Sequence, residues 1–151
     1  MNQLRIEISK VIKASPVDVY SVMSDYQVGH PAILPKPYFS KLVVVQGGKG
    51  EGTIIEVHMD VLGAKRVFHQ VVSEPEPGRV LVETDAEAGV TTSFTVDPIG
   101  DGNQSQVTIA TDIRLSPGVR GIFERLFNPW IIHRIYKQEL ELLAEYVRHG
   151  L

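Results

Sequence analysis

The chain has 151 residues, a formal net charge of −3, 43% hydrophobic residues and 22% charged residues. These values are typical of an ordinary soluble domain, so we expect residues 1–151 to form a single domain with one core. The mildly acidic charge disfavours nucleic acid as a partner, and the absence of cysteine excludes disulfides and thiolate chemistry.

No segment predicts secretion or membrane insertion. The N-terminus, MNQLRIEISK, lacks the apolar run of a signal peptide. No stretch approaches the ~18 uninterrupted apolar residues of a transmembrane helix. We therefore expect a cytoplasmic protein, whose oligomeric state the sequence does not indicate.

The first elements are a strand and a short helix. Residues 3–13 alternate between apolar and polar side chains, the period of a half-buried strand. Ser15 followed by Pro16 is typical of a helix start, and apolar residues then share one face over residues 16–26. Residues 27–39 contain three prolines but also apolar side chains. They form either a short helical turn packed inward or a lid over a cavity, in which case His30 and Tyr38 would contact a ligand.

Six further strands follow, separated by short turns. The predicted strands cover residues 42–46, 53–61, 65–73, 80–85, 90–96 and 106–114. Short connections favour antiparallel pairing, so we expect one antiparallel sheet of about seven strands.

The C-terminal arm, residues 118–149, predicts a long amphipathic helix. One apolar stripe runs along it, formed by Ile132, Tyr136, Leu140, Leu143 and Val147. Pro129 lies inside the arm, so the helix is either kinked there or a second helix starts after a cap at Asn128. The acidic residues of the arm, Glu139, Glu141 and Glu145, are expected on its solvated face.

This order of elements resembles the helix-grip fold of the START-like, or SRPBCC, superfamily, and within it the polyketide cyclase/dehydratase-like branch. The resemblance rests on the entry Ile12 to Tyr20, the glycine-rich loop before Thr53, and the proline-interrupted final helix. It implies an α+β fold, in which a curved antiparallel sheet of about seven strands wraps around the C-terminal helix, with two short helical pieces after the first strand. It also implies an apolar cavity between sheet and helix.

The strand register predicts which side chains line this cavity. If Val57 and Met59 face inward, a two-residue turn at Gly63 places Arg66, Phe68 and Gln70 on the same face. Arg66 would then either bind a polar group of a ligand or lie at the rim of the sheet and reach water. Thr92 and Thr111 fall on the inward register with Phe94, where they either bond a ligand or fill space.

Three residues of the arm complete the candidate site. His133 and Tyr136 lie beside the apolar stripe and either move protons in an enzyme or satisfy core hydrogen bonds. Trp130, together with Phe127, is expected in the core or the cavity wall. The candidate catalytic residues are therefore His133, Tyr136 and Arg66. The candidate ligand-binding residues are Tyr38, Val57, Met59, Arg66, Phe68, Gln70, Thr92, Phe94, Thr111, Trp130, His133 and Tyr136.

Metal, cofactor and phosphate sites are not expected. His58 and His69 face outward by register and would sit opposite each other, but no third ligand for zinc accompanies them. The loop GGKGEG at 47–52 leads into a strand, whereas a phosphate loop leads into a helix, so it predicts a flexible hairpin loop.

Three functions agree with this pattern. The first is binding of a small hydrophobic or aromatic molecule, such as a lipid or polyketide, in the cavity. The second is an enzyme of cyclase or dehydratase type that uses the same cavity. The third is a protein-interaction domain, which would need an exposed apolar patch. Because one fold hosts many functions, the sequence does not decide among them.

Overall fold

The computed structural model describes residues 3–114 and 128–149. These residues form seven strands and three helices. In chain order they are β1 (Gln3–Ile12), α1 (Pro16–Met23), α2 (Gly29–Ala32), β2 (Phe39–Gln46), β3 (Ile54–Val61), β4 (Ala64–Glu76), β5 (Val80–Asp85), β6 (Val90–Ile99), β7 (Gln104–Arg114) and α4 (Pro129–His149).

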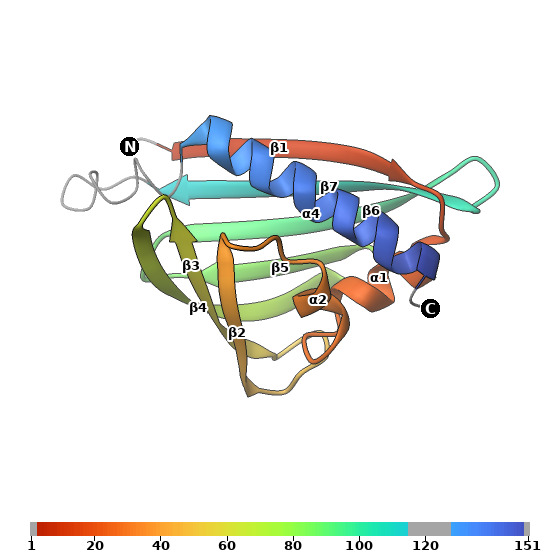
Figure 1. Ribbon diagram of the computed structural model, residues 1–151. Coiled ribbons are helices and arrows are strands. Elements are labelled where there is room, and N and C mark those ends of the chain that lie inside the picture. The colour runs from red at the N-terminus through yellow and green to blue at the C-terminus, as the bar shows by residue number, and fades with distance from the viewer. Residues whose placement is uncertain (1–2, 115–127, 150–151) are drawn as a thin grey trace.

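All seven strands belong to one antiparallel sheet with the order β1-β7-β6-β5-β4-β3-β2. The sheet curls, and α4 lies along its inner face beside β1, β7 and β6 (Figure 1). Strand β1 returns to pair with the last strand over its whole length, from Gln3 opposite Arg114 to Ile12 opposite Ser105. The predicted α+β class and helix-grip arrangement are confirmed.

The β3–β4 hairpin fixes which side chains face inward. Its turn consists of Leu62 and Gly63, which both have positive φ (52° and 86°), as a tight hairpin turn of this length requires. The turn sets Val61 opposite Ala64, and the register continues to Ile55 opposite Gln70. The predicted inward face is therefore confirmed, and Gln70 lies among apolar neighbours.

Helix α1 is shorter than predicted, because the residues after Met23 form backbone hydrogen bonds with the glycine-rich loop instead of continuing the helix. The Ser15 hydroxyl caps the helix, accepting from the Asp18 backbone N–H at 3.3 Å. After the helix, the Tyr26 N–H donates to the Gly48 carbonyl at 2.8 Å. The Gly50 N–H donates to the Ser24 carbonyl at 2.9 Å. These bonds turn the chain so that Tyr26 is fully buried in the core.

Residues 29–32 form the short inward-packed helical turn that was one of the two alternatives for the proline-rich stretch. Gly29 permits a close approach to α1, since a Cβ at this position would lie 2.4 Å from the Val22 carbonyl oxygen. Only a glycine fits there without a backbone shift. The close approach buries His30 and Ile33.

Helix α4 begins at a side-chain cap. The Asn128 Oδ1 accepts from the backbone N–H groups of Trp130 (2.9 Å) and Ile131 (3.4 Å), as predicted for a second helix starting there. Residues 118–127 of the predicted arm, including Phe127, lie outside the described residues. The 21 residues of α4 extend over roughly 31 Å. None of the described helices is long and apolar enough to cross a membrane.

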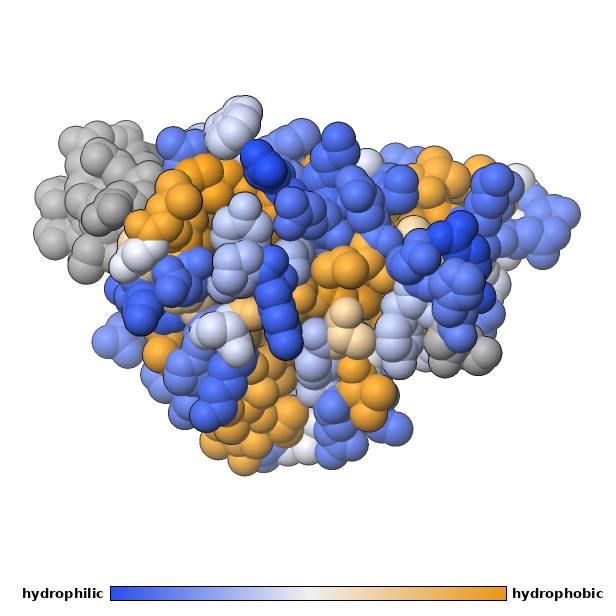
Figure 2. Space-filling model, in the orientation of Figure 1, coloured by the Kyte–Doolittle hydropathy of each residue, from blue (hydrophilic) through white to orange (hydrophobic). Residues whose placement is uncertain are grey.

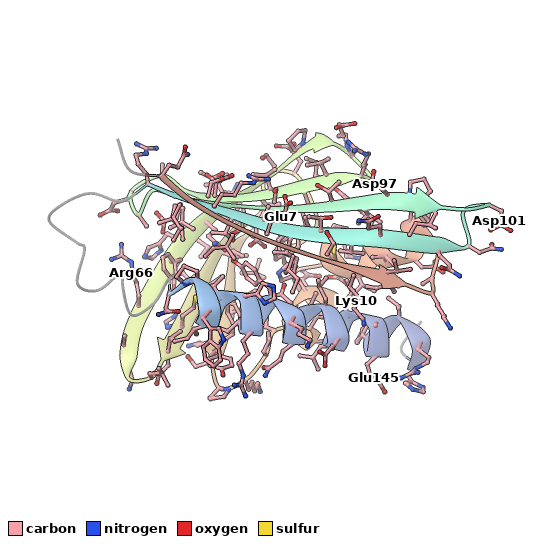
Figure 3. The ribbon with its side chains drawn as sticks, turned by 90° about the horizontal axis from the view of Figure 1, so that it is seen from above. Glu7, Lys10, Arg66, Asp97, Asp101 and Glu145 are labelled. Atoms are coloured by element: carbon pink, nitrogen blue, oxygen red, sulfur yellow. The ribbon has the colours of Figure 1, made fainter. Side chains whose placement is uncertain are left out.

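One side chain of α4 contradicts the predicted solvated face. Glu141 and Glu145 are exposed, and Glu145 points away from the sheet in Figure 3. Glu139 is only 2% exposed and faces the sheet. The prediction for Glu139 was wrong because its position, three residues after Tyr136 and four before Leu143, is on the buried stripe.

Candidate functional site

A cavity lies between the inner face of the sheet, helix α4 and the α2–β2 segment. Its side chains come from all these elements: His30, Leu34, Phe39, Leu42, Val57, Met59, Phe68, Gln70, Glu83, Val90, Thr92, Phe94, Ile132, Tyr136 and Glu139. The empty space between them is about 550 Å³, including the part open to solvent, and about 50 Å³ can hold the centre of a water-sized sphere. One water requires roughly 10–15 Å³ of the volume that can hold the sphere's centre. The cavity therefore holds a few waters.

The cavity is apolar over most of its wall but has a group of polar side chains around Glu83, which we call its hydrophilic end. On the face shown in Figure 2, hydrophobic residues are visible below the mainly hydrophilic outer side of α4, in the region of α2 and β2. The hydrophilic end consists of His30, Gln70, Glu83, Thr92 and Glu139, all of which are buried. Such a cavity, apolar with a few polar groups, is the usual form of a small-molecule site.

Glu83 on β5 is the centre of the polar groups. Its Oε2 accepts from the Tyr26 hydroxyl at 2.6 Å and lies 3.3 Å from the His30 Nε2. Burial, and then the charge of Glu83 nearby, raise the pKa of Tyr26 well above its usual value. Tyr26 therefore stays protonated and donates to Glu83.

His30 is held on both sides and in a defined tautomer. Its ring stacks on Tyr26, with ring centroids 4.5 Å apart, and meets the Phe94 ring edge-on at 5.5 Å. Its Nδ1 lies 2.7 Å from the Met23 carbonyl oxygen, which can only accept, so Nδ1 carries a proton. In a neutral ring Nε2 would then be bare and would face the Glu83 carboxylate. Nε2 therefore presents either a lone pair or, in a protonated ring, a hydrogen-bond donor to Glu83.

Glu139 on α4 is the second buried acid of the cavity. Its Oε2 has no hydrogen-bond partner among the described residues. Burial, and secondarily the nearby Glu83, raise the pKa of Glu139 well above its ordinary value of 4.5. Burial therefore favours the neutral carboxylic acid, the form that can donate a hydrogen bond into the cavity.

Gln70 adds a second unpaired polar atom. The residue is 7% exposed, and its Oε1 has no partner among the described residues. Because the two ends of an amide are assigned from their surroundings, Gln70 can present either a donor or an acceptor to a molecule in the cavity.

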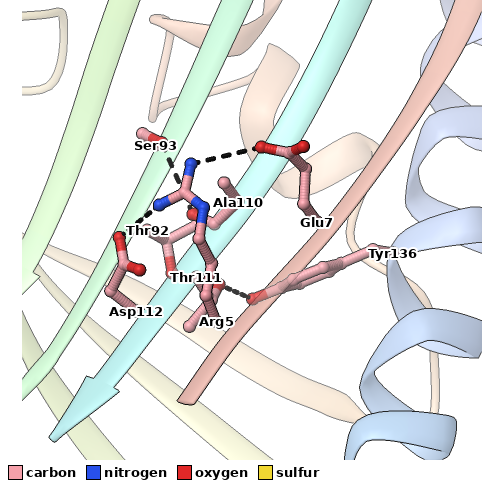
Figure 4. A network of polar contacts seen from close by, with 8 residues as sticks. All are labelled: Arg5, Glu7, Thr92, Ser93, Ala110, Thr111, Asp112 and Tyr136. Carbon is pink, nitrogen blue, oxygen red and sulfur yellow. Dashed lines mark hydrogen bonds and ion pairs between the residues drawn. The ribbon is translucent and has the colours of Figure 1, made fainter. Parts of the chain in front are cut away.

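A row of hydroxyl groups connects α4 with the sheet. The Tyr136 hydroxyl is hydrogen-bonded to that of Thr111 on β7, which in turn lies 2.9 Å from the Thr92 hydroxyl on β6. Figure 4 shows Tyr136 reaching across from the helix to Thr111. Burial raises the pKa of Tyr136 above its usual value, so it remains a neutral hydrogen-bonding group.

The structure brings most of the sequence-predicted site residues together. Those that line the cavity are Val57, Met59, Phe68, Gln70, Thr92, Phe94 and Tyr136. Thr111 is fully buried and lies behind Thr92 in the hydroxyl row. Tyr38 is half-buried outside the lining.

Arg66 also lies outside the lining. It is half-buried, at the outer edge of the molecule in Figure 3. Its guanidinium is 5.4 Å from the centre of the Phe68 ring.

Two residues of α4 do not face the cavity. Trp130 was expected in the core or cavity wall, but its side chain is 69% exposed and stacks under the guanidinium of Arg134, 5.9 Å from the ring centre. His133 was expected beside the cavity and is exposed. Both expectations were wrong, because the buried face of α4 is centred on Ile132 and Tyr136. At 100° per residue, Trp130 and His133 are turned away from it.

The two outward histidines are not opposite each other. The register pairs His69 with Glu56 and His58 with Val67, which corrects the expected pairing. Glu56 lies between them, with its carboxylate oxygens 3.7 Å from His58 and 4.0 Å from His69. Among the described residues no group of three or more potential ligands is arranged to hold a metal ion.

The central polar residues of the cavity were missed by sequence reasoning. Glu83 falls two residues after the buried Leu81 on β5, and Glu139 falls on the apolar stripe of α4, so periodicity alone places both inward. Both were passed over because acidic residues are rarely buried. Tyr26 was expected on the apolar face of the first helix, and His30 was expected at a ligand only if residues 27–39 form a lid; the structure places His30 in the cavity lining from a packed helical turn.

The fold and its internal cavity define a helix-grip protein. The chain belongs to the family described as polyketide cyclase/dehydrase and lipid transport, whose sequence profile matches residues 3–148. The NMR solution structure of KanY protein superimposes with a TM-score of 0.81 at 31% identity, covering 98% of this chain and 99% of KanY.

More distant solved structures share the fold. The Zhui aromatase/cyclase from Streptomyces sp. R1128 has a TM-score of 0.74 at 16% identity and covers 97% of this chain and 94% of its own. Norcoclaurine synthase from Thalictrum flavum, in complex with dopamine and hydroxybenzaldehyde, has a TM-score of 0.70 at 16% identity. That match covers 99% of this chain and 89% of the synthase. A search of curated proteins found no match.

Proposed function

We propose that this protein binds a small, mainly apolar metabolite in the cavity, with a polar group of the ligand at the hydrophilic end. The observation that carries the proposal is a pair of buried, unpartnered polar atoms, Gln70 Oε1 and Glu139 Oε2, in the lining of an otherwise apolar cavity. A buried polar atom without a partner costs about 1–3 kcal/mol. A ligand or water that bonds these atoms removes that cost.

Entry of an organic ligand requires the wall to move. The volume that admits the centre of a water-sized sphere is about 50 Å³, enough for only a few waters. The α2–β2 segment contributes Leu34, Phe39 and Leu42 to the wall. β2 is one of the two edge strands of the sheet, and the other edge strand, β1, lies beside α4. We therefore place the entrance at the α2–β2 segment.

Native mass spectrometry tests this proposal directly. The protein purified without added ligand is expected to carry a small molecule that is released at higher collision energy. The result against the proposal is an unliganded protein that also binds none of a panel of small aromatic compounds.

Filling the cavity from one side is expected to abolish binding. Val57 lies between Leu42 and Phe68 in the register, and all three line the cavity. Val57→Phe should therefore weaken binding of the co-purified molecule at least ~10-fold by occupying its space. The matched control is Val71→Phe on the outer face of β4, where the valine is exposed. Circular dichroism shows whether each variant folds. If Val57→Phe does not fold, the smaller change Val57→Leu is measured in its place. Equal binding by the Val57 variants and Val71→Phe would contradict this site.

A second function, acid–base catalysis of the cyclase or dehydratase type, is favoured by the two acids of the cavity. Glu139 is buried and its Oε2 has no partner among the described residues, which favours its protonated form, whereas Glu83 accepts a hydrogen bond from Tyr26 and lies 3.3 Å from the His30 Nε2. Environments that separate two acids in this way are typical of acid–base pairs. On a ketone, Glu83 would take a proton from the α-carbon while Glu139 gives one to the carbonyl oxygen, which forms the enol.

This second function is tested by isotope exchange. With acetophenone in D₂O, the protein should catalyse exchange of the methyl protons, followed by ¹H NMR. Glu83→Gln and Glu139→Gln should each lower the rate at least ~100-fold, the lower range for general acid–base catalysis. If the wild-type protein binds acetophenone but exchange proceeds only at the uncatalysed rate, the catalytic function is contradicted and the binding function stands.

A further inference from the structure

Among the described residues, the lining of the cavity carries acidic groups but no lysine or arginine. Its titratable side chains are His30 from α2, Glu83 from β5, and Tyr136 and Glu139 from α4, with Tyr26 in contact with Glu83. No lysine or arginine of the described residues belongs to it. Of the described lining residues, His30 has the basic side chain, and its two nitrogens already lie against the Met23 carbonyl oxygen and the Glu83 carboxylate.

Glu139 differs from Glu83 in its hydrogen bonding. Glu83 accepts from the Tyr26 hydroxyl and lies 3.3 Å from the His30 Nε2, whereas the Glu139 Oε2 has no partner among the described residues. At 2% exposure, a charged carboxylate would have to lose its hydration without compensation. The group that fits such a site is a neutral carboxyl, which offers one O–H donor to whatever occupies the cavity.

We propose that the hydrophilic end of the cavity is a subsite for the carbonyl oxygen of an uncharged ligand, with the Glu139 carboxyl group as the hydrogen-bond donor. The inference rests on the proposed function and specifies its ligand as a neutral ketone, aldehyde or ester. Carboxylates and phosphates are rejected, since in a medium of low dielectric constant they would meet two acids and no lysine or arginine of the described lining.

A cationic amine fits less well than a carbonyl group. Binding it would require Glu139 to ionise beside Glu83, and both the ammonium and the new carboxylate would lose their water. A neutral hydrogen bond from Glu139 to a carbonyl oxygen requires neither. Gln70 on β4 offers a second polar contact, which suits a hydroxyl group of the same ligand.

Three compounds that share a benzene ring distinguish these ligand classes. They are acetophenone, benzoate and benzylammonium, titrated into ¹⁵N-labelled protein at pH 7 and followed by NMR. Acetophenone is expected to bind at least ~10-fold more tightly than the two ions, and to shift amide signals around the cavity. Equal or tighter binding of benzoate or benzylammonium would overturn the inference and leave the proposed function intact.

Variants of Glu139 test the donor itself. Glu139→Gln keeps a neutral N–H donor and should bind acetophenone within ~3-fold of the wild-type protein. Glu139→Leu has no donor and should bind it ~10-fold more weakly. The matched control is Glu141→Gln, an exposed acid on the same helix.

Undiminished binding by Glu139→Leu would show that Glu139 is not the donor. Failure of all three compounds to bind also overturns the inference, whereas the proposed function is judged separately by the co-purified molecule.

Discussion

Replacement of Glu83 by alanine should lower the free energy of unfolding by about 3–5 kcal/mol, the range for breaking a buried charged hydrogen-bonded pair. The Tyr26 hydroxyl and the His30 Nε2 both lose their acceptor, and both side chains are almost completely buried. The measurement is urea unfolding followed by circular dichroism.

A surface acid serves as the control for the Glu83 variant. Asp97 forms an ion pair with Arg79 at 2.8 Å, but both side chains are about half exposed. Asp97→Ala is therefore expected to cost no more than about 1 kcal/mol. Glu83→Gln retains an acceptor for Tyr26 and should fall between the two. A loss for Glu83→Ala as small as that for Asp97→Ala would mean that Tyr26 and His30 do not depend on Glu83.

The fold could be predicted from the sequence because each of its elements carries a local signal. The alternation in β3 defined the inward face, and the Gly63 turn transferred that register to β4, which placed Phe68 and Gln70 correctly. Asn128 marked the start of α4. These signals are local in sequence. Of the strand pairings, the one between β1 and β7 at the edge of the sheet joins strands that are far apart in the chain.

The candidate site was predicted only in part, for two physical reasons. On α4 the apolar character of Trp130 and the charge of Glu139 favoured a buried Trp130 and an exposed Glu139. The helical period indicates the reverse. Periodicity placed Tyr26 on the apolar side of the first helix but left the path of residues 27–39 open, because that path depends on how the glycine-rich loop holds the chain after α1.

The second large effect is on the pH dependence of stability. Burial raises the pKa of Glu139 in the folded protein above 4.5, so that between these two pKa values the folded chain holds a proton that the unfolded chain has released. Stability therefore falls as pH rises through this window, by about 1.4 kcal/mol per pH unit for one proton. Glutamine cannot ionise, so the Glu139→Gln variant lacks this loss.

The difference in free energy of unfolding between Glu139→Gln and the wild-type protein isolates this contribution, because the other groups titrate in both proteins and largely cancel. We expect the difference to be constant below about pH 4.5, the ordinary pKa of the side chain. Above that pH it should grow in favour of the variant, until the folded pKa is reached. Glu141→Gln, on the exposed side of the same helix, should show a constant difference throughout. A constant difference for Glu139→Gln as well would mean that Glu139 ionises as easily in the folded protein as in the unfolded chain. In that case it could not serve as a neutral donor inside the cavity.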